Sequence, residues 1–341
     1  MKKAIFILGL AILTIGLVIC NSYSANKKLA QTGLQFLSVA TEARAAAMGE
    51  AFTTVEGRSL SLFHNPANLS LMNNFMDLSL NQNKWIADMT HYSASIAFNP
   101  TYGKYGTFGL SLISVDYGEF IGTRVDPTSD KGYIDTGEFK PSAFAIGLGY
   151  AKSLTDRFSV GGHIRYVNQK LGNSIIPIGE TVAEGTKEVS NDLSVFAIDF
   201  GTIYRTGFKS LVFGMTVRNF SQEVKFESEG FQLPLTFKMG ISMNIFDVLM
   251  EKTNMHSLLI SVDAIHPRDY SEQLNFGAEY TLMNMLALRF GYMLNRDEQD
   301  FAAGFGVQTK FLGDRMIALD YAYTPFGVFD NVQRVSFRLS L

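Results

Sequence analysis

The sequence predicts an all-β protein: a transmembrane antiparallel β-barrel of the outer-membrane type, with about fourteen strands and a small N-terminal helical plug. Three observations lead to this prediction. Apolar side chains alternate with small or polar ones along most of the chain. The polar side of each alternating segment carries few charges, and only 18% of all residues are charged. The connections between segments are short and long in turn, as in barrels that cross an outer membrane.

The alternation has the period of two that is typical of β-strands. In residues 301–311, Phe301 and Phe305 share one face, and Gly304 and Gly306 share the other. The same pattern predicts fourteen strands, an even number as single-chain bacterial barrels require. Their predicted bounds are 76–83, 90–98, 105–117, 142–152, 157–170, 194–206, 208–220, 235–247, 256–266, 273–283, 285–295, 300–311, 314–324 and 333–341.

The polar faces distinguish a membrane barrel from a soluble β-sandwich, which fills its water-facing side with Lys, Glu and Asp. Here the polar faces hold mostly Gly, Ala, Ser and Thr, which suit the inside of a closed tube, while the charge-free apolar faces suit lipid. We expect the scattered charged side chains to form a network in the lumen; the alternative is that they line a permeation path. They are His163, Arg165, Asp199, Arg218, Glu279, Arg289, Lys310, Asp320 and Arg338.

The lengths of the connections predict which end of the barrel faces the periplasm and which faces the outside of the cell. If residues before 76 lie in the periplasm, every second connection is a periplasmic turn and should be short. Short connections lie near residues 154, 206, 284 and 313, and modestly longer ones lie near 100 and 250. Long, polar connections span 118–141, 171–193 and 221–234. This asymmetry predicts that the long connections are extracellular loops.

The N-terminus has the pattern of a signal peptide for export by the Sec pathway. A basic start, Met1–Lys3, precedes an apolar run, and small residues then favour cleavage before Ala25. Residues 1–24 are therefore predicted to be removed, and the mature chain to reach the outer membrane of a Gram-negative-type cell. Lipid attachment at Cys20, the single cysteine of the chain, is the alternative, although the bulky Ile19 departs from the lipoprotein pattern.

Other classes of function find little support. The formal net charge of −3 gives no sign of nucleic-acid binding. Five histidines, at positions 64, 91, 163, 256 and 266, show no metal-ligand spacing, so no metal or other cofactor is expected. His163 could serve a barrel hydrolase, but no nucleophile motif accompanies it. We therefore expect no enzymatic activity.

Residues 25–75 do not alternate and are predicted to form a hatch, or plug, ahead of a barrel at 76–341. The Ala-rich run around Arg44 predicts a short helix that ends near Gly49. Arg44 is expected to pair with an inward carboxylate such as Glu279 or Asp320. A fourteen-strand tube is wider than its own side chains can fill, so small helices inside it are physically useful.

A second short helix is predicted after "FHNPANL", with Asn65 as its N-cap and Pro66 at its first position. The structural interpretation of Asn65, Pro66 and Ala67 is that they cap this helix and shape the hatch. The functional interpretation, left open at this point, is that they form a gate element that contacts a ligand or partner.

The segments "FLSVATEARAAAMGEAF" and "VEGRSLSLFHNPANLSLM" resemble the opening of the PorV/PorQ family of outer-membrane proteins. That family belongs to the FadL-like superfamily of fourteen-stranded barrels with an N-terminal hatch. Residues 43–51 and 65–69 match its pattern of Ala-Arg-Ala-x-x-Met-Gly-x-Ala followed by Asn-Pro-Ala-x-Leu. Glu50 departs from it, because many relatives have a second Gly there.

The resemblance implies transport or translocation across the outer membrane. One expected role is in type IX secretion, with exported proteins and translocon subunits as partners. The alternative is a FadL-like channel for hydrophobic small molecules such as fatty acids or hydrocarbons, and a further class is a structural or lipid-modifying barrel. All three place outer-membrane lipid around the protein. A small-molecule channel needs a continuous apolar tunnel, so a sealed, charged lumen would count against it.

Overall fold

The computed structural model describes residues 31–101, 103–178, 185–226, 229–249, 255–311, 313 and 315–341. The predicted signal peptide at 1–24 and the alternative lipid site at Cys20 lie outside the described residues. No helix in the described part of the chain is long and apolar enough to cross a membrane.

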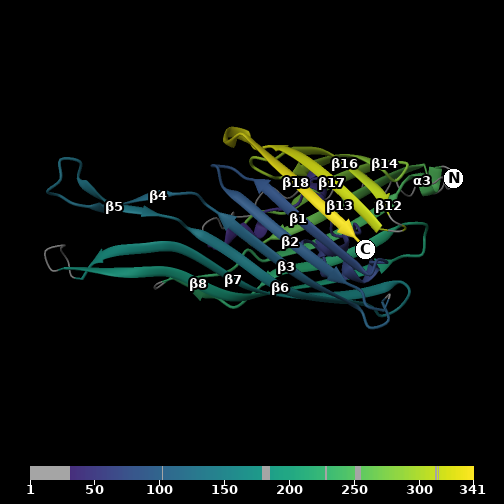
Figure 1. The fold of residues 1–341 in the computed structure, drawn as a ribbon, viewed down its shortest axis with the longest axis horizontal. Coiled ribbons are helices and arrows are strands. Elements are labelled where there is room, and N and C mark those ends of the chain that lie inside the picture. Colours follow the sequence, from purple (N-terminus) through teal and green to yellow (C-terminus); the bar gives the residue numbers. More distant parts are fainter. Residues whose placement is uncertain are drawn as a thin grey trace.

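Fourteen strands of the described residues close into one antiparallel barrel (Figure 1), which confirms the predicted fold class. In pairing order they are β1 (Met76–Lys84), β18 (Asn331–Ser340), β17 (Arg315–Pro325), β16 (Phe301–Phe311), β15 (Leu286–Leu294), β14 (Gln273–Leu282), β13 (His256–Pro267), β12 (Thr236–Asn244), β9 (Val212–Phe220), β8 (Thr186–Arg205), β7 (Phe158–Pro177), β6 (Ser142–Ser153), β3 (Thr107–Asp116) and β2 (Thr90–Phe98). The ring closes where β1 pairs with β18, with Leu80 opposite Phe337.

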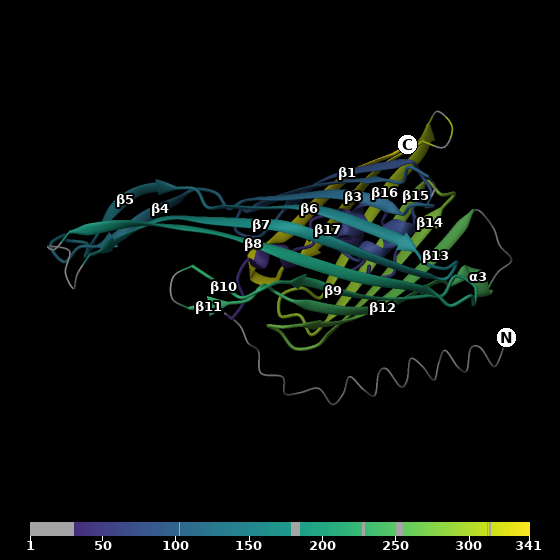
Figure 2. The same ribbon diagram turned by 90° about the horizontal axis from the view of Figure 1, so that it is seen from below.

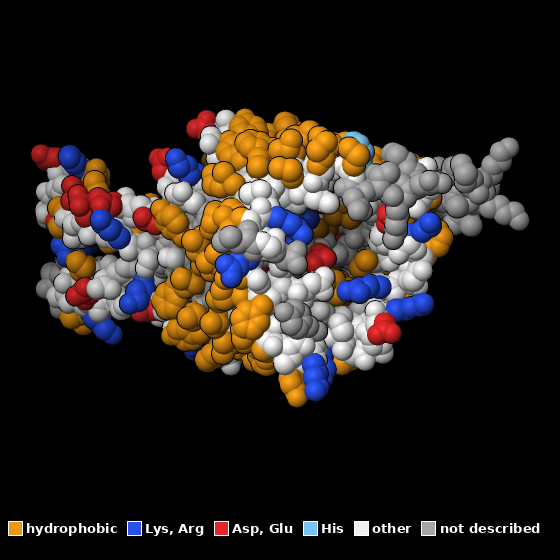
Figure 3. Space-filling view, turned by 45° about the vertical axis from the view of Figure 1, so that its right-hand side comes forward, with side chains coloured by type: hydrophobic (Ala, Val, Ile, Leu, Met, Phe, Trp, Pro, Cys, Tyr) orange, Lys and Arg blue, Asp and Glu red, His pale blue; other side chains and the backbone are white. Residues whose placement is uncertain are grey.

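The two faces of each strand differ as the alternation predicted. On β15, Leu288 and Phe290 expose 64% and 53% of their surface, whereas Arg289 between them exposes 8%. Apolar side chains of this kind form a wide band over the outside of the barrel (Figure 3). Such a band is stable in contact with acyl chains, since every backbone group behind it is paired within the closed sheet.

The structure departs from the prediction at one end of the barrel. Strands β7 and β8 continue to Pro177 and from Thr186, about seven residues beyond the expected bounds of 170 and 194. They extend there as a two-stranded ribbon beside a second hairpin, β4 (Phe120–Val125) and β5 (Tyr133–Phe139) (Figures 1 and 2). A ribbon outside the membrane needs no apolar face, so hydrophobic alternation gave no sign of it. These long connections mark the extracellular end of the barrel.

Three short elements complete the connections. They are the two-stranded sheet of β10 (Val224–Lys225) and β11 (Gly230–Phe231), the helix α3 (Phe246–Leu249) and the 3-10 helix η5 (Gly327–Phe329). The sheet belongs to the long connection between β9 and β12, and α3 belongs to the connection between β12 and β13 at the opposite end.

Residues 31–75, which we call the hatch, lie inside the barrel (Figure 2). They form η1 (Gln35–Ser38), α2 (Ala43–Ala47), η2 (Arg58–Phe63) and η3 (Pro66–Leu71), of which only α2 is an α-helix. The second predicted helix is thus a 3-10 helix, η3. Hatch side chains contact the wall on every side, because α2 packs on β15 to β18 and η3 packs on β6 to β8. These two groups of strands lie on opposite sides of the ring.

The hatch fits closely because the wall carries glycines where it touches. A methyl group at Gly291 of β15 would overlap the Gly49 backbone, and one at Gly161 of β7 would lie 2.5 Å from the Ala67 nitrogen. Both glycines are on the lumen face, so the small residues predicted for that face leave room for the hatch.

Candidate functional site

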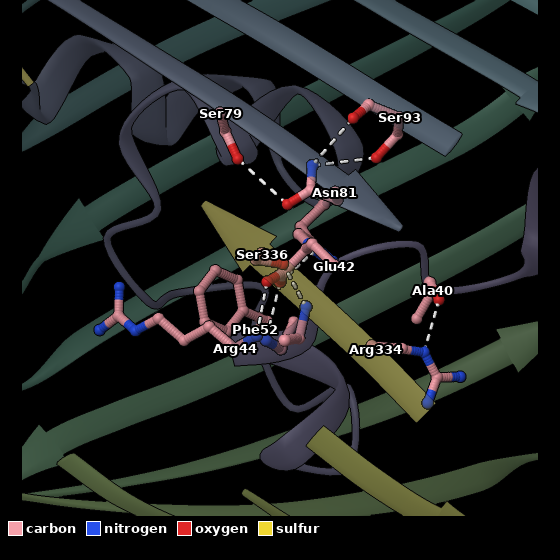
Figure 4. Close-up of polar contacts among 12 residues, drawn as sticks. Ala40, Glu42, Arg44, Phe52, Ser79, Asn81, Ser93, Arg334 and Ser336 are labelled. Atoms are coloured by element: carbon pink, nitrogen blue, oxygen red, sulfur yellow. Dashed lines mark hydrogen bonds and ion pairs between the residues drawn. The ribbon is translucent and has the colours of Figure 1, made fainter. Parts of the chain in front are cut away.

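Helix α2 carries the first part of the family pattern and begins at a charged cap. The Glu42 carboxylate accepts hydrogen bonds from the backbone N–H groups of Arg44 and Ala45, each at 2.7 Å. Gly49 follows the helix with φ of +61°, as a residue that ends a helix in the left-handed region must have. Figure 4 shows Glu42 and Arg44 beside Ser336 of β18, whose hydroxyl accepts from the Ala43 N–H at 2.8 Å.

Arg44 joins the hatch to the barrel wall through a network of four charged side chains. Its guanidinium donates to both carboxylate oxygens of Glu279, at 2.7 and 2.8 Å. Glu279 also accepts from Arg289 at 2.6 Å, and Arg289 donates to Asp320 at 2.7 Å. Burial alone would lower the pKa of Arg44, but the Glu279 carboxylate raises it above its ordinary value. The four charges therefore balance in pairs.

The other predicted lumen charges lie in different surroundings. Arg165 is 1% exposed and donates to Asp199 at 2.7 Å. Arg338 is also buried and lines a small cavity beside Arg44. Lys310 lies on the polar side of β16 but is exposed near the strand end, outside the buried network. Arg218 has no carboxylate within 4.0 Å among the described residues.

Asn65 begins η3 and holds the second half of the hatch. Its side-chain oxygen accepts from the Ala67 N–H at 3.1 Å, the geometry of an N-cap. Its amide group donates to the Thr53 carbonyl at 3.0 Å and to the Thr202 carbonyl of β8 at 3.2 Å. Pro66 at the first helical position loses no hydrogen bond, since that N–H has no partner within a helix.

A histidine–glutamate contact connects the two halves of the hatch. His64, next to the Asn-Pro-Ala motif, lies 3.1 Å from the Glu42 carboxylate through its Nε2 atom. Burial lowers the pKa of His64 below its ordinary value of 6.5. Although burial would raise the pKa of Glu42, its hydrogen bonds to His64 and to the start of α2 lower it. A neutral imidazole therefore donates to an ionised carboxylate.

Three lumen side chains have the order of a hydrolase triad. The Ser111 hydroxyl lies 2.8 Å from His163 Nε2, and His163 Nδ1 lies 3.2 Å from Asp199. All three are at most 4% exposed, and none lines either cavity described below. Asp199 is moreover bound by Arg165 and the Asn219 N–H. A nucleophile needs space for its substrate, and these three side chains are enclosed in the wall.

Two cavities lie on opposite sides of the hatch and share no lining residue. The larger one, which we call the vestibule, opens at the extracellular end and has a volume of about 1510 Å³. The smaller one lies toward the periplasmic end, measures about 200 Å³ and is bordered by the Arg44–Glu279 network. Residues at the inner end of the vestibule are Glu50, Arg218 and Lys238. Charged and polar groups of the hatch thus separate the two spaces.

Sequence reasoning did not single out Glu42, Ser111 or Lys238. Lys238 lies on the small-residue face of the predicted strand 235–247, two residues before Gly240, so the alternation could have identified it. Ser111 shares its face of β3 with Thr107, Gly109, Ile113 and Val115 and had no distinguishing signal. Glu42 had none either, because glutamate is not among the preferred helix caps.

Comparisons with solved structures support the same architecture. The toluene transporter TodX of Pseudomonas putida aligns with a TM-score of 0.56 at 13% identity, over 87% of this chain and 96% of that one. The toluene transporter TbuX of Ralstonia pickettii gives 0.54 at 13% identity, over 87% and 96%. A FadL homologue of Pseudomonas aeruginosa gives 0.53 at 11% identity, over 89% and 98%. At these identities the likeness shows the fold alone.

A search among curated proteins finds no match. The family model described as "Type IX secretion system protein PorV" matches residues 22–266, which include the whole hatch and the strands from β1 to β12. This match covers more than half of the chain. The protein, a closed fourteen-strand outer-membrane barrel with an internal hatch, therefore belongs to the PorV family of type IX secretion system proteins.

Proposed function

We propose that this chain acts in type IX secretion as a plugged barrel that receives exported proteins at its extracellular face and passes them to partner subunits. The family membership supports the pathway. The observation that carries the proposal is the closed lumen. A hatch joined to the wall by the Arg44–Glu279 and Glu50–Arg296 ion pairs separates two cavities, and neither forms a continuous apolar tunnel through the barrel.

The closed lumen argues against uptake of hydrophobic small molecules through the barrel. An apolar solute gains nothing from a path lined by ionised side chains, and moving the hatch would break the Arg44–Glu279 pair. The toluene transporters named above share the fold, and their substrate does not transfer to this chain by fold alone. Secretion partners, in contrast, need only the outside of the protein.

The extracellular hairpins offer a surface for such partners. On β4, Ile121 and Val125 expose 66% and 72% of their surface, and Ile178 beyond β7 exposes 67%. These side chains stand outside the lipid-facing band, on ribbons whose outer edges are unpaired. Exposed apolar groups on an edge outside the membrane are typical of protein-binding surfaces.

The proposal is tested by deleting the gene in its own bacterium and restoring either the wild-type chain or I121S/V125S. We expect the wild type to restore proteins on the cell surface and in the medium, measured by mass spectrometry, and the double variant to restore much less. T123S on the same strand is the matched control. The wild type, I121S/V125S and T123S must give equal amounts of folded barrel in the outer membrane, measured by the shift in gel mobility that heating causes.

Two outcomes would contradict the proposal. Secreted proteins unchanged by the deletion would exclude a role in secretion. Loss of growth on hydrocarbons or fatty acids, with secretion intact, would favour the channel alternative instead.

We further propose that the chain reaches the outer membrane by Sec export, that residues 1–24 are its signal peptide, and that 25–75 and 76–341 act as hatch and barrel. The sequence pattern supports the first two statements. N-terminal sequencing of the mature protein should give Ala25 as its first residue. A chain that begins with a lipid-modified Cys20 would contradict this.

A further inference from the structure

The inner end of the vestibule holds two cationic side chains without carboxylate partners. Lys238 on β12 is 6% exposed, and its side chain has no hydrogen bond and no carboxylate within 4.0 Å among the described residues. Arg218 on β9 has none either, and its Nε atom is buried without a partner. A buried charge is costly unless it is paired, so the buried Lys238 beside the half-buried Arg218 requires an explanation.

Strand pairing places these two cations next to each other. Lys238 is opposite Thr216, and Thr236 is opposite Arg218, so the two cations are diagonal neighbours on adjacent strands. Diagonal neighbours on one face of a sheet lie roughly 7 Å apart, within reach of long side chains. Both line the vestibule, so an anion that enters it can contact both.

Two carboxylates of the wall lie near the pair but do not line the vestibule. Asp199 is bound by Arg165, His163 and the Asn219 N–H. Asp263 accepts from the Phe52 and Thr53 N–H groups of the hatch through Oδ2, and its buried Oδ1 atom has no hydrogen-bond partner among the described residues.

Glu50, at the inner end of the vestibule, pairs with Arg296 at 3.1 Å. Burial would raise the pKa of Glu50, but Arg296 and Lys238 lower it to about 2, so this carboxylate stays ionised. Among the described side chains that line the inner end, Arg296, Lys238 and Arg218 are cations and Glu50 is the one carboxylate, so the lining carries two cations in excess.

The rim of the vestibule carries mostly negative charge, opposite to that of its inner end. Its carboxylates are Glu223, Glu229, Asp269, Asp297 and Glu298, and Arg268 lies among them. Four of the five carboxylates are in exposed connections, where water and salt screen them from the inner end. Asp269, the buried one, accepts from Thr32 and Gln35. The rim therefore does not neutralise the cations below it.

From this arrangement we propose that the vestibule is a binding site for a phosphate group, held by Lys238 and Arg218. A phosphate monoester carries a charge of about −1.5 to −2 near neutral pH, which matches two unpaired cations better than a single carboxylate does. Arginine and lysine are the usual donors to phosphate oxygens. A cavity of about 1510 Å³ is much larger than phosphate, so a larger phosphorylated molecule can be accommodated.

This inference is independent of the proposed role in secretion. It concerns which ligand the extracellular cavity takes, and it can hold or fail whether or not secretion depends on the chain.

Calorimetric titration of the purified full-length protein with inorganic phosphate tests the site. The protein is kept in an uncharged, phosphate-free maltoside detergent at constant ionic strength. We expect saturable binding by the wild type and at least tenfold weaker binding by K238M and R218M, since each loses a charged hydrogen-bond donor. K310M, which removes an exposed lysine at the other end of the barrel, is the matched control and should bind as the wild type does.

A variant that should bind phosphate more tightly complements the two that should bind it more weakly. E50Q removes the carboxylate that neutralises Arg296, so we expect phosphate to bind several-fold more tightly. Without phosphate, K238M should unfold at the same temperature as the wild type or higher, because it removes an unpaired buried charge. A lysine with a purely structural role would give a lower unfolding temperature.

Short-chain phosphatidic acid, titrated in parallel, identifies the source of the phosphate. Binding at least tenfold tighter than that of inorganic phosphate indicates a lipid headgroup, and similar affinity indicates a soluble phosphate compound; both support the site. No saturable binding of either probe, or binding that K238M leaves unchanged, would overturn it.

Discussion

The two halves of the hatch are held to the barrel by different physical means. The first half, around α2, is joined to its wall by charges: Arg44 pairs with Glu279, which also binds Arg289. In the second half, Arg58 of η2 lies 3.9 Å from Asp77 of β1, but η3 itself has no ion pair to the wall among the described residues. It is held by the fit of Ala67 against Gly161 and by the hydrogen bonds of Asn65.

This difference gives each part of the family pattern its own task. The Ala-Arg-Ala and Asn-Pro-Ala motifs lie against opposite walls of the ring, so together they fix the hatch across the lumen. A hatch held on one side only could swing open. Charge and shape also respond to different changes, which makes the two anchors separately testable.

The largest expected effect is on the charge anchor. E279Q leaves the half-buried guanidinium of Arg44 and the buried one of Arg289 without their shared carboxylate, and removal of one partner from a buried ion pair costs about 3–5 kcal/mol. We expect a loss of that size in the free energy of unfolding, measured by urea denaturation in lipid vesicles. E138Q, on the exposed part of β5, should change it by less than about 0.5 kcal/mol. Equal stability of E279Q and E138Q would contradict the charge anchor.

The shape anchor is tested by two adjacent glycines on β7. A methyl group at Gly161 would lie 2.5 Å from hatch backbone atoms, whereas one at Gly162 would have its nearest neighbour at 3.9 Å. We expect G161A to lose about 1–3 kcal/mol of unfolding free energy through overpacking and G162A to lose little. The same denaturation experiment measures both. If G161A were as stable as G162A, the hatch would not press on this wall.

Variants of Asn65 can distinguish its role as a helix cap from its hydrogen bonds to the Thr53 and Thr202 carbonyls. N65A removes both the cap on Ala67 and the donors to Thr53 and Thr202, and we expect it to cost about 1–2 kcal/mol. N65S keeps a capping oxygen without adding a charge and removes the amide donors. Cleavage of the hatch by added protease should therefore rise in the order wild type, N65S, N65A. Equal cleavage of N65S and N65A would assign the whole effect to the lost donors.

The contact between the halves predicts a modest dependence on pH. The pKa values of His64 and Glu42 are both lowered in the folded protein, from ordinary values of 6.5 and 4.5. The unfolded chain therefore binds more protons, so stability is full above pH 6.5 and falls as the pH decreases, first through His64 and then, below 4.5, through Glu42. Hydrogen exchange of the hatch should speed up from pH 7 to pH 5 beyond the intrinsic change, and H64Q should remove this excess. A hatch whose corrected exchange is independent of pH would contradict the prediction.

The barrel could be predicted from the sequence because one physical rule, lipid on one face and lumen on the other, repeats in every strand. That rule no longer applies at Lys170, where β7 leaves the membrane, and the predicted strand ended there although the real one continues to Pro177. The contacts within the hatch were harder to predict from the sequence. The spacing of the motifs predicted caps at Gly49 and Asn65, but only the folded chain brings His64 beside Glu42.

Glu50 is an example of a residue whose contact could not be predicted from the sequence. Its φ of +61° lies in the left-handed region that glycine tolerates best. Glu50 instead forms an ion pair with Arg296, which comes from the connection between β15 and β16, 246 residues further along the chain. No local pattern could have indicated that partner.

Ion conductance of single barrels in a planar lipid bilayer tests the central claim, that both anchors together keep the lumen closed. We predict that the wild type gives no steady current under an applied voltage, and that E279Q combined with G161A gives frequent openings. Steady conductance by the wild type would show an open path through the barrel and would contradict this account.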